Sequence, residues 1–139
     1  MNNKYFKPNG YIFTLATAND DTPNDSETNI ETINSGVKSL IYREHGQMHK
    51  WKFGMDCKDL IKLNNIIYLF IFSFSCLIGS FRENIDGHIN SCFAGEMVLS
   101  EYGSVAFLGS YNTSGKGMNL LAKGIVTEMF AKKIKQQVG

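Results

Sequence analysis

The stretch that decides the fold is IYLFIFSFSCLIGSF, residues Ile67–Phe81. It is a run of aromatic and β-branched residues that is too short to span a bilayer as a helix. Apolar runs of this kind predict a strand buried on both faces in the middle of a parallel sheet. The run stops at Ser75-Cys76, and Gly79 follows three residues later. Because chemistry in such sheets lies just beyond the carboxyl ends of the strands, Cys76 is the first candidate for a functional residue.

Length and composition favour one ordinary domain. The 139 residues are 43% apolar, which suffices for a single core, so we expect a single domain over residues 1–139. A formal net charge of +1 gives no electrostatic argument for a nucleic acid or an anionic membrane as partner. The three cysteines are widely spaced, with neither a disulfide framework nor zinc-ligand spacing, so at least one thiol is expected to be free.

The first residues are polar. Met1–Gly10 has no apolar core of a secretory signal, and a strand is expected almost at once, at Tyr11–Ala16. This start is abrupt for an α/β domain, so we expect a fragment or one piece of a longer precursor. The polar segment Thr17–Thr28 carries four carboxylates that could hold calcium, but it lacks the spacing of an EF-hand, and a solvated loop is favoured.

The rest of the chain alternates between strand and helix patterns. Alternation of this kind predicts a mainly parallel sheet with helices on its faces. The expected strands beside the central one are Val37–Tyr42 and Ser104–Leu108. The expected helices and loops are a helical turn at Asn29–Asn34 with Gly36 as its C-cap, a loop at Gln47–Phe53, a helix at Asp56–Leu63 capped by Asp56, a helix at Ile89–Tyr102, a loop at Gly109–Gly117 and a helix at Met118–Val138.

Two strand ends carry residues of chemical interest. His45-Gly46 follows the strand at Val37–Tyr42, and Cys76 follows the central strand. Neighbouring parallel strands would bring both to one edge, where an imidazole can take the proton of a thiol. The N–H groups of Gly46 and Cys76 could face a developing oxyanion. A free cysteine is also commonly a small buried hydrophobe and a loop histidine a surface residue, so the spacing alone leaves both interpretations open.

Several motifs, in order, resemble the gingipain-type cysteine peptidases of the caspase-like superfamily. They are INSGVKSLIYREHG at Ile33–Gly46, Trp51, FSFSCLIGSF at Phe72–Phe81, SCFAGEM at Ser91–Met97 and GSVAFLGS at Gly103–Ser110. The resemblance covers about residues 30 to 130. It implies an α/β caspase-like three-layer fold with a mainly parallel sheet and helices on both faces. It also implies a cysteine endopeptidase that acts on peptide or protein substrates.

The resemblance assigns roles to individual residues. The catalytic histidine of the family falls on His45 and its nucleophile on Cys76, with the backbone N–H groups of Cys76 and Gly46 as oxyanion donors. Such enzymes line their specificity pocket with the loop after the next strand, which makes Tyr111 a pocket candidate, with a plain exposed tyrosine as the alternative. Trp51 is a second pocket candidate, although packing over the end of the sheet near His45 is favoured.

The resemblance also implies what lies around the site. The chemistry requires no cofactor, no metal site is expected, and a structural calcium ion finds no support in this sequence. His49 and His88 have no partner spacing and are expected at the surface. Family members are secreted bacterial surface proteins, so a secreted or cell-surface location is implied, without a membrane span.

Two differences from the family pattern lead to alternatives. Glu44 stands where the family has glycine, so its carboxylate either crowds the site or hydrogen-bonds locally. Family domains are longer, so we expect a truncated domain whose acidic third catalytic residue and much of whose pocket lie outside this chain. The alternatives are an inactive or fragmentary homologue that acts as a binding or structural module, and an unrelated α/β module in which Cys76 is inert and far from His45.

Overall fold

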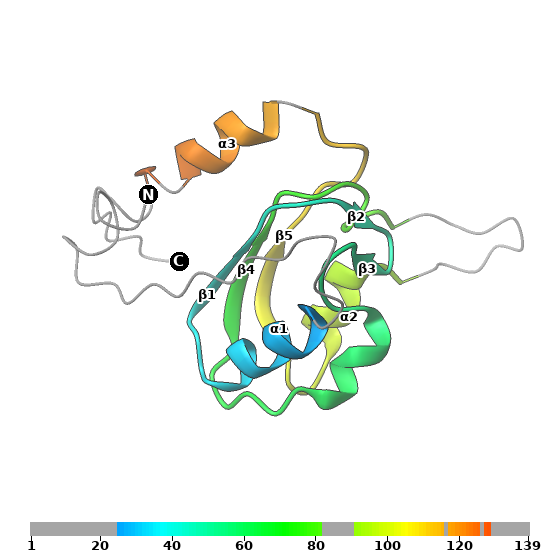
Figure 1. Ribbon diagram of the computed structural model, residues 1–139, viewed down its shortest axis with the longest axis vertical. Coiled ribbons are helices and arrows are strands. Elements are labelled where there is room, and N and C mark those ends of the chain that lie inside the picture. The colour runs from blue at the N-terminus through cyan, green and yellow to red at the C-terminus, as the bar shows by residue number, and fades with distance from the viewer. Residues whose placement is uncertain (1–24, 82–90, 116, 126, 129–139) are drawn as a thin grey trace, which may run out of the picture. The chain divides into compact units, whose positions relative to one another are not determined.

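The computed structural model describes residues 25–81, 91–115, 117–125 and 127–128 (Figure 1). The chain divides into two compact units, one of Ala16–Ser114 and one of Met1–Leu15 with Gly115–Gly139, and each is described by itself. The predicted strand at Tyr11–Ala16 lies outside the described residues. So does the part of the predicted Thr17–Thr28 loop that precedes residue 25.

The larger unit alternates strands and helices as predicted. In chain order its elements are α1 (Asp25–Asn34), β1 (Ser39–Tyr42), β2 (Gly46–Gln47), β3 (Lys50–Trp51), the 3₁₀ helix η3 (Cys57–Lys62), β4 (Leu69–Ser73), α2 (Phe93–Leu99) and β5 (Ser104–Leu108). The second unit contains α3 (Gly117–Ile125), the first part of the helix predicted at Met118–Val138. Residues 126 and 129–138 of that predicted helix lie outside the described chain.

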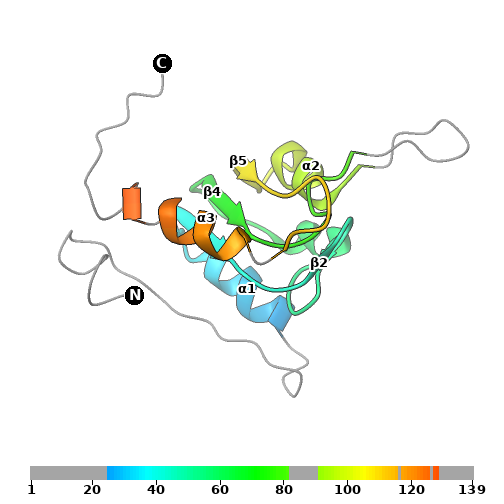
Figure 2. The same cartoon turned by 90° about the horizontal axis from the view of Figure 1, so that it is seen from above.

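The sheet is parallel and has β4 at its centre, in the order β1-β4-β5. Tyr42 of β1 pairs with Ser73 of β4, and Phe72 pairs with Leu108 of β5. Seen from above, β4 and β5 lie side by side (Figure 2). The α/β class, the parallel sheet and the central place of the apolar run are therefore confirmed.

The core lies on one face of this sheet. Leu69 and Ile71 of β4 point into it, and α1, η3 and α2 supply most of the other buried side chains. Phe70 points to the opposite face and is 37% exposed, so the prediction that the central strand is buried on both faces is wrong at this position. The helices of this unit pack against the Leu69 face, which explains the difference. Val105 of β5 is also exposed.

Helix α1 begins at Asp25, four residues before the predicted start. The end of the segment interpreted as a loop is therefore helical. Acidic and hydroxyl side chains suit the first turn of a helix, but they also have the composition of a loop. Gly36 follows the helix with a φ of 87°, the left-handed conformation predicted for its C-cap.

Helix α2 is shorter than the predicted Ile89–Tyr102 helix. It ends at Leu99, and the N–H of Ser100 donates to the Glu96 carbonyl. The chain then folds back under the last turn. It passes so close that a Cβ atom on Gly103 would lie 2.0 Å from the Met97 carbonyl oxygen. Residues 82–90 lie outside the described chain.

The predicted loop at Gln47–Phe53 is instead a small hairpin. β2 and β3 pair antiparallel, with Gly46 opposite Trp51. The connecting residues Met48 and His49 are not the glycine or asparagine that two-residue hairpin turns favour, so the sequence contains no turn signal. The hairpin carries the chain from the end of β1 back into the core at Trp51.

A capping box begins η3, as the sequence predicts for Asp56. The Asp56 side chain accepts from the Lys58 N–H at 2.8 Å, and Asp59 accepts from the Asp56 N–H at 3.0 Å. Asp59 also accepts from the Ser26 hydroxyl at 2.7 Å, which joins η3 to α1, and from Lys62 at 2.8 Å. Partial burial would raise the pKa of Asp59, but the hydrogen bonds from Lys62, Ser26 and the Asp56 backbone together lower it.

Asp59→Ala is expected to lower the free energy of unfolding by about 1–2 kcal/mol at pH 7, the usual value of such a cap. Since the pKa of Asp59 is lowered in the folded state, its stabilisation is full above the ordinary pKa of 3.8 and is lost as the pH falls through the lower folded value. Urea unfolding of wild type and variant at pH 7 and pH 3 measures this difference. Lys58→Ala, an exposed change in the same turn, is the control. A difference that stays constant across pH would contradict the assignment.

Candidate active site

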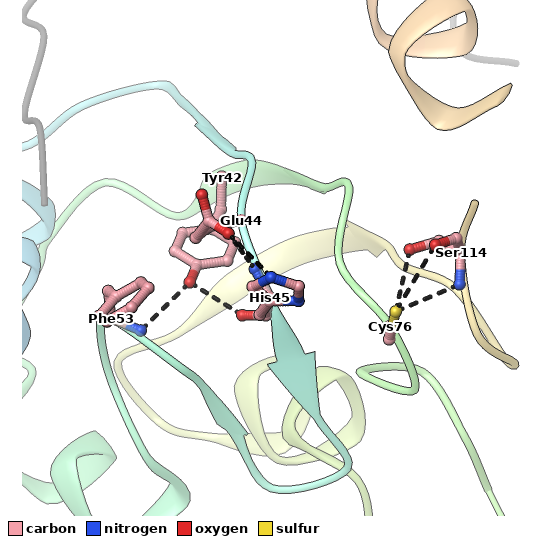
Figure 3. Close-up of polar contacts among 6 residues, drawn as sticks. All are labelled: Tyr42, Glu44, His45, Phe53, Cys76 and Ser114. Carbon is pink, nitrogen blue, oxygen red and sulfur yellow. Dashed lines mark hydrogen bonds and ion pairs between the residues drawn. The ribbon is translucent and has the colours of Figure 1, made fainter. Parts of the chain in front are cut away.

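His45 and Cys76 lie beyond the carboxyl ends of two neighbouring strands. Tyr42 and Ser73 are paired across β1 and β4, and each candidate residue follows its strand three positions after that pair. Figure 3 shows the two side chains coming from adjacent strand ends. The predicted shared edge is therefore confirmed, while the chemical roles of the two residues remain predictions.

Gly46 brings the two strand ends into direct contact. A Cβ atom placed on this glycine would lie 2.7 Å from the Ser75 Oγ and 2.9 Å from the Cys76 carbonyl oxygen. Both are closer than side chains tolerate, so only glycine fits without displacing the chain before Cys76. The backbones that carry the predicted oxyanion donors, Gly46 and Cys76, are thus packed against each other.

The chain turns sharply after Cys76. Leu77 adopts a φ of 59°, a left-handed conformation that costs a residue with a Cβ about 1–2 kcal/mol. The turn is secured by the loop that follows β5, because the Leu77 N–H donates to the Asn112 carbonyl at 3.2 Å and the Gly79 N–H to the Ser110 carbonyl at 3.0 Å. This loop, residues 110–114, therefore lies directly against the turn that presents Cys76.

The Cys76 sulfur contacts the end of the same loop. It lies 3.2 Å from the Ser114 backbone nitrogen and 3.3 Å from the Ser114 Oγ. Its thiol also donates to the Ser114 carbonyl at 3.7 Å. The family resemblance predicts that this loop lies near the site, but it does not identify Ser114. A serine in a polar loop carries no signal that distinguishes it from its neighbours.

The His45 side chain is open to solvent, with 71% of its surface exposed. Its Nε2 lies 3.6 Å from the Glu44 Oε1, and the same oxygen accepts from the His45 backbone N–H at 3.0 Å. Of the two alternatives for Glu44, the structure shows the local hydrogen bond. Among the described residues, no hydrogen bond joins His45 to Cys76, and Figure 3 shows the polar contacts of each leading to different partners.

The backbone of His45 is held more firmly than its side chain. The Tyr42 hydroxyl donates to the His45 carbonyl at 3.1 Å, and the Lys52 N–H donates to it at 2.9 Å. The Phe53 N–H approaches the same hydroxyl at 3.4 Å. The strand and the hairpin thus fix the backbone from which the imidazole extends, while the imidazole itself is largely exposed.

Trp51 is not on a substrate pocket. Its side chain is fully buried, stacks on Tyr42 with ring centroids 4.3 Å apart and lies 4.9 Å from the Phe93 ring. This corrects the pocket role implied for Trp51 and agrees with the packing role that was favoured. The hairpin turns this side chain into the core, which a loop interpretation of Gln47–Phe53 did not anticipate.

A buried chain of hydrogen bonds starts at Trp51 and was missed in the sequence. The indole Nε1 donates to the Ser73 hydroxyl at 2.9 Å, and the Ser73 and Ser75 hydroxyls lie 2.7 Å apart. All three side chains are at most 2% exposed. Ser73 and Ser75 are two positions apart in an apolar stretch, so their side chains lie on one face. This spacing is a sequence signal for a hydrogen-bonded pair.

The other candidates have separate surroundings. Tyr111 is 58% exposed in the loop after β5, and its pocket role remains a prediction. His49 is exposed as expected, and His88 lies outside the described residues.

Burial, reinforced by Glu96 and Asp56, raises the pKa of Cys57 to about 11, so that thiol is protonated at neutral pH. Within the described part of the chain, no three His, Cys, Asp or Glu side chains gather in a way that could hold a metal ion.

A parallel sheet that brings a thiol and an imidazole to one edge is an arrangement suited to a cysteine hydrolase. The sequence matches the profile of peptidase family C25 over residues 2–139, and the chain belongs to this family. The gingipain-type resemblance is thus confirmed, with cysteine peptidase as the class it indicates. The alternative of an unrelated α/β module is wrong. A search of curated protein sequences gives no match.

Solved structures show the same fold. The crystal structure of the Arg-specific cysteine proteinase gingipain R (RgpB) is 22% identical, with a TM-score of 0.66 over 85% of this chain and 29% of that one. The complex of Porphyromonas gingivalis RgpB pro- and mature domains is 22% identical, with a TM-score of 0.62 over 76% and 27%. The chain thus spans less than a third of the length of these proteins. No helix in the described ranges is long and apolar enough to cross a membrane.

Proposed function

We propose that this chain is a cysteine endopeptidase that hydrolyses peptide bonds through the Cys76 thiolate, assisted by His45. The observation that carries the proposal is the strand register, which brings both residues to one sheet edge three positions beyond a paired Tyr42 and Ser73. Membership of peptidase family C25 supports the same chemistry. A catalytic contact that is open without substrate commonly closes only when substrate binds, and the His45 side chain, 71% exposed, is not held by packing around it.

In the proposed reaction the Cys76 thiolate attacks the carbonyl carbon of the scissile bond and forms a tetrahedral oxyanion. His45, protonated by the thiol, gives its proton to the leaving amine as the C–N bond breaks. A water molecule then attacks the thioester, and His45 takes its proton. Collapse of the second intermediate breaks the C–S bond, releases the carboxylic acid and restores the thiolate. No step needs a metal ion or an organic cofactor.

The close contact at Gly46 supports the proposed oxyanion site. Two backbone N–H groups stabilise an oxyanion only if both can point at one oxygen atom, about 3 Å from each. The packing of Gly46 against Ser75 and the Cys76 carbonyl keeps the two backbones together. The loop of residues 110–114, with Tyr111, is the proposed wall for the substrate side chain. Peptides or proteins outside the bacterial cell are the proposed substrates, as the family resemblance implies.

One observation favours a second candidate, an inactive homologue that acts as a binding module. In the described structure the polar contacts of Cys76 go to Ser114, and His45 is paired with Glu44 instead. In such a module the sheet edge would bind peptide without forming a covalent intermediate.

The two candidates separate in a labelling experiment. The protein is treated at pH 7 with peptidyl acyloxymethyl ketones that carry basic, acidic or apolar side chains before the ketone, and each cysteine is followed by peptide mapping. An endopeptidase is expected to react at Cys76 at least 10²-fold faster than at Cys57, whose raised pKa keeps it protonated, and to prefer one side chain. Equal slow labelling of both thiols in folded protein would refute turnover and favour the binding module.

A further inference from the structure

Ser114 meets the Cys76 sulfur with two groups that can donate hydrogen bonds. Its backbone N–H lies 3.2 Å from the sulfur, and its hydroxyl oxygen lies 3.3 Å away. The contact to the Ser114 carbonyl, in which only the thiol can donate, is longer, at 3.7 Å. The N–H contact requires the sulfur as acceptor, and the hydroxyl contact allows either direction.

Hydrogen bonds to a charged group favour the charged form, and they are stronger than those between neutral groups. A thiolate can accept from the Ser114 N–H and hydroxyl together, whereas the neutral thiol is a weak acceptor. A thiolate that accepts from both groups would be held without a hydrogen bond from His45. This matters here because His45 is not hydrogen-bonded to Cys76 in the described structure.

The loop is held in place to make these contacts. Backbone hydrogen bonds from Leu77 and Gly79 to the carbonyls of Asn112 and Ser110 tie the loop to both sides of the turn after Cys76. The Thr113 N–H donates to the Asn112 side chain at 2.9 Å, which shapes the loop just before Ser114. The position of the Ser114 N–H thus follows from the backbone of the loop and not from a mobile side chain.

We propose that Ser114 is a further residue of the site, which holds the Cys76 sulfur as a thiolate through its backbone N–H and hydroxyl. The inference rests on the proposed function, in which that thiolate is the nucleophile. The proton released by the thiol passes to His45 or to water. Each hydrogen bond to the charged sulfur is expected to increase the rate of Cys76 alkylation at neutral pH about 10-fold or more.

Iodoacetamide alkylation tests the inference, because this small reagent requires no substrate recognition. The rate at Cys76 is followed by peptide mapping between pH 5 and pH 10 in the full chain. Ser114→Ala, which removes the hydroxyl, is expected to slow alkylation at pH 7 about 10-fold and to move the pH–rate profile to higher pH. Ser114→Thr is expected to restore most of the rate, since it keeps the hydroxyl. Ser35→Ala, a matched change at an exposed serine outside the site, is expected to leave the rate unchanged.

The outcomes are distinct. An unchanged profile in Ser114→Ala, with an unchanged unfolding midpoint, would overturn the inference. A faster reaction in that variant would also overturn it and would mean that Ser114 shields the sulfur. If peptidyl ketones fail to label Cys76 while iodoacetamide still depends on Ser114, the proposed function fails and the role of Ser114 stands. If peptidyl ketones label Cys76 and Ser114→Ala changes nothing, the proposed function stands and the role of Ser114 fails.

Discussion

His45→Ala is expected to lower kcat/KM for peptide hydrolysis by about 10²–10⁴-fold, the usual contribution of a positioned general acid and base. The reason is that the leaving amine must be protonated before the C–N bond breaks, and His45 is the imidazole that the strand register brings to the same sheet edge as Cys76. Cys76→Ala supplies the zero baseline. The substrate in the assay has the peptide sequence whose ketone derivative labels Cys76 fastest.

The matched control for this prediction is His49→Ala. His49 is also exposed and lies only four residues away, at the turn of the β2–β3 hairpin, so its removal is expected to leave kcat/KM within about twofold. If His45→Ala hydrolyses peptide as fast as His49→Ala does, the assignment of His45 is wrong. The Glu44→Gly variant restores the family pattern and removes the pairing of Glu44 with His45 at 3.6 Å. A lower kcat/KM in this variant would mean that the carboxylate helps the reaction, and a higher one would mean that it obstructs the site.

Trp51→Ala is expected to lower the free energy of unfolding by about 3–5 kcal/mol, the usual cost of removing a large aromatic side chain from a core. Its ring is fully buried, and it stacks on Tyr42 and packs against Phe93. Small domains have only about 5–15 kcal/mol in total, so the loss is a large share of the stability. Urea unfolding followed by circular dichroism measures it.

Trp51→Phe separates packing from hydrogen bonding at this position. Phenylalanine keeps an aromatic ring against Tyr42 but removes the Nε1–H that donates to Ser73 at 2.9 Å. The expected cost of the lost hydrogen bond is about 1–3 kcal/mol. Tyr68→Phe is the control, because its hydroxyl bonds the Glu101 carbonyl at an exposed position, and it is expected to cost under about 0.5 kcal/mol. Equal losses in the free energy of unfolding for Trp51→Phe and Tyr68→Phe would show that the buried hydrogen bond contributes no more than the exposed one.

Periodicity and apolar runs predicted the sheet because they report burial directly. The run that includes β4 is apolar because this strand lies at the centre of the sheet. Gly36 marks a helix end by its positive φ, and Asp56 marks a helix start by the hydrogen bond that its side chain accepts. The shared edge of His45 and Cys76 followed from parallel pairing alone. These features depend on local sequence and on one rule of topology.

Features that depend on contacts between distant residues could not be predicted in the same way. The β2–β3 hairpin lacks turn residues, and it is held where Trp51 fills the core and the Lys52 N–H bonds the His45 carbonyl. The contact between Ser114 and Cys76 spans 38 positions and depends on how a loop crosses a turn. Exposure of Phe70 depends on which face the helices cover, and a single apolar residue carries no information about that.

The chain of hydrogen bonds from Trp51 through Ser73 to Ser75 links the core to the sheet edge that carries Cys76. One end of it lies at the centre of the core, and the other lies against Gly46, next to Cys76. The two regions are therefore coupled, and we expect a change at Trp51 to loosen the strand end that carries Cys76 as well as the core.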